Sequence, residues 1–202
     1  MIKNRLKKVL LAGIFLGTVL TANSSNYMYN GYSMLAIEGG YSDLAADITD
    51  LSDNPGPYEQ LNGASYNLGM KIGAQTGHYR VFLSARTYKD SDDNFDYLTT
   101  YGIEGQYLFY MFDWVDFFIG AGGGLINAKF NDKSEAYART INDPYFSGEM
   151  GFNIHSGEWM DFELGARYVS MDAANLQENE IEYRLNDMIS AYASVIFKFK
   201  MD

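Results

Sequence analysis

His155 and Ser156 stand side by side, and they are of the types that hydrolases use as general base and nucleophile. Such a pair works only when the histidine lies within hydrogen-bond reach of the serine and an acid orients the histidine. Both residues fall in a short polar segment, His155–Glu158, and His78 falls in a similar one, Thr76–His78. We therefore expect polar turn residues here and no catalytic residue.

Asp90, Asp92, Asp93 and Asn94 place several oxygen atoms close together, as calcium loops do. The segment lacks the glycine and the closing glutamate of an EF-hand loop, so we expect a solvated acidic loop, with weak cation binding as the alternative. The glycine run 120–124 is not a phosphate loop, because no Lys-Ser/Thr pair and no helix follow it. With two His and no Cys, neither a metal nor another cofactor is expected.

Ten charged residues form the strongest candidate cluster, because they share the polar faces of alternating segments. Five are acidic and five are basic, although the whole chain has a net charge of −11. A solvated surface has no reason to balance its charges, whereas a narrow enclosed lumen does, since unpaired buried charge costs several kcal/mol. The cluster is interpreted as a static internal network or, alternatively, as a gate that could rearrange to pass small ions. Its members are Glu38, Lys71, Arg80, Arg86, Glu104, Glu149, Asp161, Glu163, Arg167 and Lys198.

The first 24 residues are predicted to be a secretory signal peptide, with an N-terminal anchor helix as the alternative. A basic start precedes an apolar run, Val9–Ala22, that is shorter than the roughly 20 residues a spanning helix needs. Cleavage is expected after Ser24 or after Ala22, which leaves one domain over 25–202. That domain has 11 basic and 26 acidic residues, so it is not expected to bind nucleic acid.

Period-2 alternation, which is typical of strands, recurs along this domain. In Ser65–Gln75, for example, Tyr66, Leu68, Met70 and Ile72 alternate with small or polar residues. Eight such segments are predicted to be strands: Ser33–Tyr41, Ser65–Gln75, Tyr79–Tyr88, Tyr97–Tyr110, Phe117–Ala128, Tyr145–Ile154, Trp159–Ser170 and Met188–Phe199.

The connections between these segments alternate in length, as they do in an antiparallel meander. Short ones follow the second, fourth and sixth strands: Thr76–His78, Met111–Asp116 and His155–Glu158. Longer, mostly acidic ones follow the others: Ser42–Ala64, Lys89–Asp96, Lys129–Pro144 and Met171–Asp187. All short turns should therefore lie at one end of the sheet and all long loops at the other.

Two further patterns favour a barrel in a membrane. Glycines recur on the charged face, at 69, 73, 102, 120, 122, 124, 151 and 165, and an eight-stranded barrel has little room inside. Aromatic residues gather near both ends of the strands, as in the girdles that flank the apolar band of outer-membrane barrels. Those near the short turns are Phe109, Tyr110, Phe112, Trp114, Phe117 and Trp159, and those near the long loops are Tyr41, Tyr66, Tyr97, Phe146 and Tyr168.

The domain resembles the small eight-stranded outer-membrane barrels of Gram-negative bacteria, of the OmpA, OmpX and opacity-protein type. The glycine-rich segment 120–125 is similar to a strand often seen in that group. The end of the chain is similar to its assembly signal, carried here by Tyr192, Phe197 and Phe199, although Lys200-Met201-Asp202 follow the last aromatic residue. No peptidoglycan-binding domain is expected.

The resemblance implies an all-β, eight-stranded antiparallel up-and-down transmembrane β-barrel with short periplasmic turns and longer extracellular loops. It implies a place in the outer membrane, with membrane lipid, lipopolysaccharide and the barrel assembly machinery as partners and a host or surface ligand at the loops. We expect a non-enzymatic envelope or adhesin-like surface protein with at most a narrow gated pore. The alternatives are a lipid A-modifying barrel enzyme and a secreted lipocalin-like carrier.

Overall fold

The computed structural model describes residues 31–50, 59–91, 95–130, 140–171, 173–176 and 181–200. Among them, no helix is long and apolar enough to cross a membrane. The expected signal peptide 1–24 and its cleavage sites lie outside the described residues. Nine strands are present in the described part: β1 (Tyr32–Asp50), β2 (Glu59–Thr76), β3 (Tyr79–Asp90), β4 (Phe95–Phe112), β5 (Val115–Phe130), β6 (Thr140–His155), β7 (Met160–Met171), β8 (Ala173–Leu176) and β9 (Ile181–Lys200).

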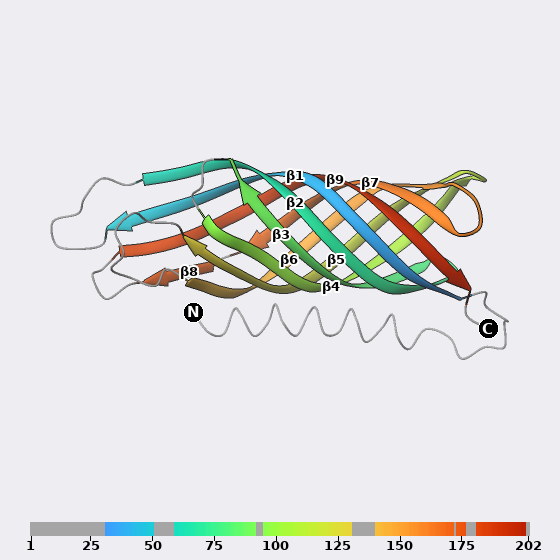
Figure 1. Cartoon of the computed structure of the whole chain (residues 1–202), viewed down its shortest axis with the longest axis horizontal. Helices are drawn as coiled ribbons and strands as arrows, with labels where there is room; N and C mark the ends of the chain where they lie inside the picture. The colour runs from blue at the N-terminus through green and yellow to red at the C-terminus, as the bar shows by residue number, and fades with distance from the viewer. Residues whose placement is uncertain are drawn as a thin grey trace. The chain divides into compact units, whose positions relative to one another are not determined.

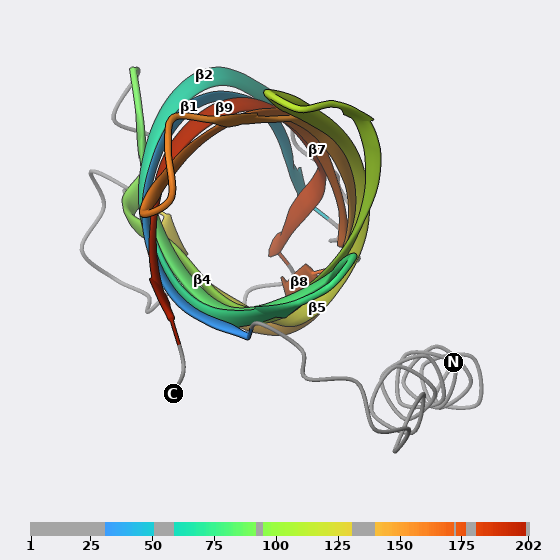
Figure 2. The ribbon, with the colours of Figure 1, turned by 90° about the vertical axis from the view of Figure 1, so that its right-hand side faces the viewer.

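The strands form one closed antiparallel barrel (Figures 1 and 2). Each strand from β1 to β7 pairs with the next, β7 pairs with β9, and β9 pairs with β1 from Tyr32 to Asp50. The short β8 continues the path of β7 and pairs with the beginning of β9. The nine strands therefore make an eight-stranded wall, as predicted.

Tight turns join the strands at the periplasmic end, which lies at the right in Figure 1. Gly77 has a φ of 52°, a left-handed conformation that glycine adopts without steric cost, and it turns β2 into β3. The turn predicted over Met111–Asp116 is shorter, because β4 continues to Phe112 and β5 begins at Val115.

At the other end the strands run further than predicted. The expected loop Ser42–Ala64 is strand up to Asp50 and again from Glu59, and β9 begins at Ile181 inside the expected loop Met171–Asp187. A membrane-spanning strand needs about 9–11 residues, whereas β1 has 19 and β9 has 20. The extracellular ends of the barrel therefore stand above the membrane.

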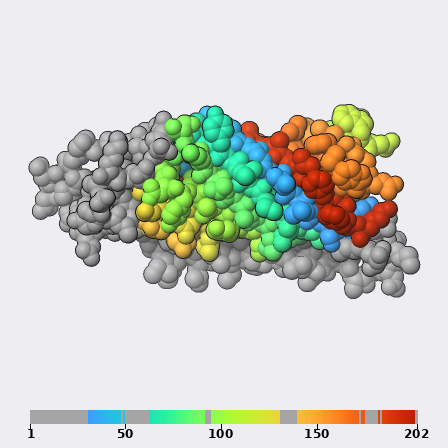
Figure 3. All heavy atoms as spheres, viewed as in Figure 1, coloured from blue at the N-terminus to red at the C-terminus, as the bar shows by residue number. Residues whose placement is uncertain are grey.

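The predicted assignment of the two faces is confirmed. Leu68 is 62% exposed on the outside, whereas Glu104 and Arg167 are buried inside. In a lipocalin-like carrier, apolar side chains face inward along the whole barrel. Here the apolar side chains of this region face outward, which argues against the lipocalin-like alternative. Side chains of β1, β2 and β9 run across the middle of the face seen in Figure 3, between green ones on the left and orange ones on the right.

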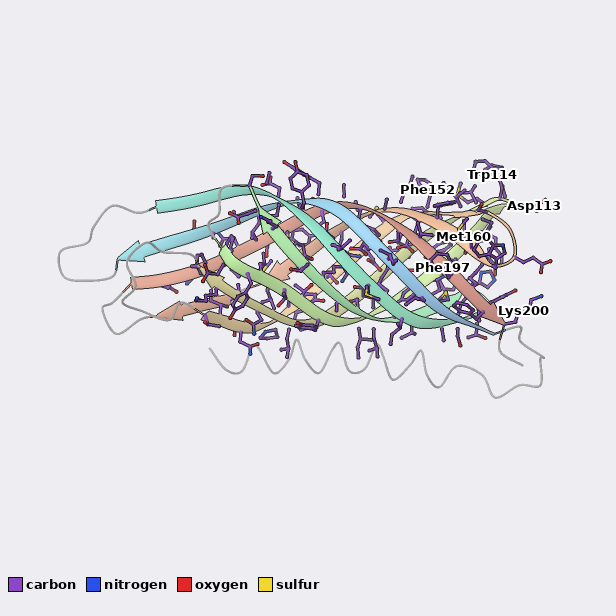
Figure 4. The ribbon with its side chains drawn as sticks, in the orientation of Figure 1. Asp113, Trp114, Phe152, Met160, Phe197 and Lys200 are labelled. Atoms are coloured by element: carbon purple, nitrogen blue, oxygen red, sulfur yellow. The ribbon has the colours of Figure 1, made fainter. Side chains whose placement is uncertain are left out.

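Aromatic residues form the two predicted rings on the outer surface. Tyr41 and Tyr66 pack edge to face near the extracellular side, with ring centroids 5.8 Å apart. Phe112 stacks on Trp114 at the periplasmic side, the end at which Figure 4 labels Trp114. Such rings lie at the two membrane–water interfaces. The band between them is the part of the wall that faces lipid.

Inside the barrel, close approach of neighbouring strands requires glycine at some positions. A Cβ atom on Gly124 would clash with the carbonyl oxygen of Tyr101, and one on Gly151 would clash with that of Leu164. This agrees with the expectation that a narrow lumen needs small inward residues.

Candidate functional site

The centre of the lumen holds a carboxylate, Glu38 on β1, that is surrounded by three cations from other strands. Its Oε1 atom lies 2.8 Å from Nε of Arg86 and 2.8 Å from Nη1 of Arg167, and its Oε2 atom lies 3.4 Å from Nζ of Lys71. Asn67 adds a hydrogen bond from Nδ2 at 3.2 Å. All of these side chains are buried. Such pairing is required because an unpaired ion in the interior costs several kcal/mol.

Three more carboxylates complete this central network. Nζ of Lys71 lies 2.7 Å from Glu163, Nη2 of Arg167 lies 3.0 Å from Glu149, and Arg86 pairs with Glu104. The four acids face three cations, so hydrogen bonds from neutral groups supplement the pairing.

Neutral donors supply those hydrogen bonds. Gln106 donates from Nε2 to Glu149 at 2.9 Å and to Glu163 at 3.3 Å, and Ser84 donates to Glu104 at 2.8 Å. Gln106 and Ser84 are not among the ten predicted residues, because charge was the signal that singled those out. Their positions on the same face as the charges were the available signal.

Aromatic rings border the central network on its periplasmic side. The ring of Tyr192 lies 4.3 Å from the guanidinium carbon of Arg167 and 5.2 Å from Nζ of Lys71, and Nζ of Lys71 also lies 5.2 Å from the ring of Phe82. These are cation–π distances. Of the three residues predicted as the assembly signal, Tyr192 points into the lumen, whereas Phe199 is exposed outside and Phe197 is half-buried.

A second cluster closes the periplasmic mouth of the lumen around Asp161. This carboxylate lies 2.6 Å from Nζ of Lys198, 3.0 Å from Nη2 of Arg80 and 3.1 Å from Nδ1 of His155. Nε2 of His155 lies 3.0 Å from Asp116. Arg80 connects the two clusters, since its Nη1 atom lies 3.7 Å from Glu163.

The structure thus divides the ten predicted residues between two places. Arg80, Asp161 and Lys198 lie at the mouth, and the other seven lie in the centre. His155 is predicted to be a polar turn residue; in the structure it ends β6, next to the turn, and lies between two carboxylates. His78 does lie in a turn, where Nδ1 donates to the carbonyl oxygen of Leu108 at 2.9 Å.

The segment 90–94, predicted to be a solvated acidic loop, is only partly described. Asp90 ends β3 and is buried, whereas Asp92, Asp93 and Asn94 lie outside the described residues. Within the described ranges, no group of three or more His, Asp or Glu side chains is arranged to hold a metal ion.

Above the central network, the lumen changes character and becomes apolar. Buried side chains from seven of the barrel strands and from β8 pack together there, and they include Leu44, Leu98, Ile126, Ile141, Leu185 and Met188. From the periplasm outward, the lumen therefore contains a charged mouth, an ion-paired centre and an apolar layer.

A closed antiparallel sheet, an apolar outer band between aromatic rings and a polar centre together define a transmembrane β-barrel of the outer-membrane type. The protein is accordingly located in the outer membrane.

No model of a known protein family matches the sequence, and no curated protein matches it either. Solved structures with a similar fold include two outer-membrane barrels. Neisserial surface protein A (NspA) shares 15% identity with a TM-score of 0.56, over 82% of this chain and 97% of that chain. The N-terminal β-barrel domain of Pseudomonas aeruginosa OprF shares 14% identity with a TM-score of 0.52, over 84% and 99%. Both likenesses concern the fold alone.

Proposed function

We propose that this protein is a non-enzymatic outer-membrane barrel that holds its extracellular strand ends at the cell surface, in an envelope or adhesin-like role. The observation that carries the proposal is the filled lumen. Ion pairs occupy its centre, and apolar side chains occupy its extracellular part. A barrel filled in this way acts as an anchor rather than as a channel.

The surroundings of His155 support a non-enzymatic role. Both ring nitrogens face carboxylates, at 3.0 Å from Asp116 and 3.1 Å from Asp161, so neither nitrogen is directed at Ser156. The pair also lies at the periplasmic end of the barrel, whereas lipid A lies in the outer leaflet. A lipid A-modifying enzyme would need its reactive groups at the opposite end.

The ion pairs of the central network favour a static network over a gate. Passing an ion would require separation of buried pairs such as Arg167 and Glu38, and breaking one buried pair costs about 3–5 kcal/mol. The ion would then meet a packed, mainly apolar layer that includes Leu98, Ile126 and Leu185. Conduction is therefore at most narrow and gated.

The proposed partners follow from the location. Lipid and lipopolysaccharide surround the outer band, and the barrel assembly machinery reads the last strand with Phe197 and Phe199. A host or surface ligand meets the extracellular ends of the strands, where exposed acidic residues such as Asp43 and Asp187 lie.

Two measurements test the proposal. First, cells with and without the protein are compared for adherence and detergent sensitivity, and their lipid A is analysed by mass spectrometry. We expect a change in adherence or detergent sensitivity with an unchanged acyl pattern. An altered acyl pattern would support the enzyme instead, and no change in any of the three would contradict the proposed role.

Second, the purified protein and its Glu104→Ala variant are compared in planar bilayers. A static network predicts no current steps in either protein. Steps in the parent that change in the variant would establish the gate.

A further inference from the structure

A concave groove lies on the lipid-facing side of the barrel, where β1 and β9 close the sheet and β7 follows. Its volume is about 390 Å³. We call it the seam groove and define it by its outward residues: Ile37, Gly39, Phe162, Leu164, Ala193, Val195 and Phe197.

Small residues in register make the floor of the seam groove. Gly39 pairs with Ala193, and Ala193 pairs with Leu164 on the other side. A Cβ atom built on Gly39 would meet one neighbour, the carbonyl oxygen of Asn67, at an ordinary distance of 3.9 Å. The space above Gly39 is therefore open, while larger side chains stand around it.

The position of the seam groove determines what can fill it. Tyr41, in the extracellular aromatic ring, lies two residues beyond Gly39 on the same face of β1. At the periplasmic end Trp159 stacks on Phe197, with ring centroids 6.2 Å apart. The groove thus lies between the two interfaces, in the hydrocarbon region, and its apolar side chains contact acyl chains rather than water.

A cation stands at the periplasmic end of the same strand. The side chain of Lys200 is 62% exposed, and its Nζ atom forms an exposed ion pair with Glu158 at 3.6 Å. Figure 4 shows Met160, Phe197 and Lys200 toward the end of the barrel where Trp114 lies. An ammonium group at this level can pair with a lipid phosphate.

We propose that the seam groove binds one acyl chain of a phospholipid of the periplasmic leaflet, with the phosphate near Lys200. The chain enters past Phe197 and ends over Gly39 and Ala193. A second copy of the protein fits less well, because stable protein interfaces bury about 1,200–2,000 Å². The seam groove is a local depression rather than a surface of that size.

Photo-crosslinking of the full chain in phosphatidylethanolamine vesicles tests this proposal. One probe phospholipid carries a diazirine near the carboxyl end of an acyl chain, and a second carries it at the methyl end. Adducts are mapped by mass spectrometry. We expect several-fold more adducts on segments 35–41, 160–166 and 191–197 than on the lipid-facing control segment 79–87. The first probe should label near Met160 and Phe197, and the second near Gly39 and Leu164.

Matched substitutions provide the control. Gly39→Leu fills the groove, and Gly105→Leu places the same side chain on β4, where a Cβ atom likewise meets one carbonyl oxygen, that of Ala121, at 4.0 Å. Gly39→Leu should abolish the enrichment, and Gly105→Leu should preserve it. If Gly39→Leu does not fold, as judged by the heat-induced shift on a gel, Ala193→Leu replaces it.

Three results would overturn the proposal. Even labelling around the barrel would mean that the groove holds no particular lipid. A reversed order of the two probes would mean that the chain comes from the outer leaflet. A dimer in the vesicles that Gly39→Leu dissociates would mean that a second copy occupies the groove.

Discussion

The membrane-spanning and extracellular parts of the barrel have opposite interiors, and strand β1 shows the change within a few residues. In the membrane, Ile37 is exposed and Glu38 is buried. Above it, Asp43 is exposed and Leu44 is buried. On β9, Asp187 is exposed next to buried Met188, and one pair further along Ile189 is exposed next to buried Ser190.

The difference shows that the surrounding medium decides which side chains go inside. Where lipid surrounds the wall, apolar residues face outward, and the polar residues meet in the lumen as ion pairs. Where water surrounds it, the wall can bury its apolar residues, as a soluble barrel does. The extracellular half is therefore stabilised by apolar burial, and the membrane half is held by charge pairing inside.

The largest expected effect comes from the centre of the network. Glu38→Gln keeps the shape of the side chain but leaves Arg86 and Arg167 without a charged partner at this position. We expect the free energy of unfolding to fall by about 3–5 kcal/mol, measured by urea unfolding in lipid vesicles with tryptophan fluorescence. The control is Glu158→Gln at an exposed position. A loss equal to that of the control would mean that the pairs contribute little.

The apolar layer should respond as a conventional core. Leu185→Ala removes a fully buried side chain from it, and we expect a loss of about 2–5 kcal/mol in the same assay. Ile189→Ala, on the outer face, should cost less. Equal costs would show that the extracellular interior is not packed as a core.

An arginine substitution on the outer face should lower the stability of the membrane-spanning part much more than that of the extracellular part. Leu68→Arg or Leu164→Arg places a charge in the hydrocarbon, which costs roughly 2–4 kcal/mol near the membrane midplane. Asp43→Arg, in the water-facing region, should change stability little. If Asp43→Arg proved as costly as Leu68→Arg, the membrane would extend higher than the reversal of polarity indicates.

The smallest effect is expected at the exposed ion pair between Lys129 and Asp96, whose side chains are 42% and 37% exposed. Surface pairs contribute about 0–1 kcal/mol and are screened by salt. A double-mutant cycle with Lys129→Ala and Asp96→Ala should give a coupling in that range that vanishes at high salt. A coupling of about 3–5 kcal/mol, the size expected for breaking a buried pair, would place this pair in a dry environment.

The alternation predicted the eight crossings, the two faces and the residues that meet in the lumen, because one repeating rule applied wherever lipid surrounds the wall. It did not predict the strand ends above Tyr41. There the apolar residues change to the other face, so Asp43 and Leu44 break the pattern and the segment resembles an acidic loop.

The mouth cluster was also only partly predictable. Asp116 and His155 are 39 residues apart in sequence, and the strands shift register between Tyr110 and Phe112, just before Asp116. Local alternation carries no information about such a shift. Charge alone identified Arg80, Asp161 and Lys198, but not the histidine that lies beside them.

Because the barrel wall continues above the membrane, its extracellular rim lies at a defined height above the aromatic ring that contains Tyr41. From Tyr41 to Asp50, β1 continues for nine residues, which at about 3.3 Å per residue and a tilt of roughly 40° lifts the rim by roughly 20 Å. Because this rim is a paired sheet with a packed apolar interior, it holds the extracellular ends of the strands at that height.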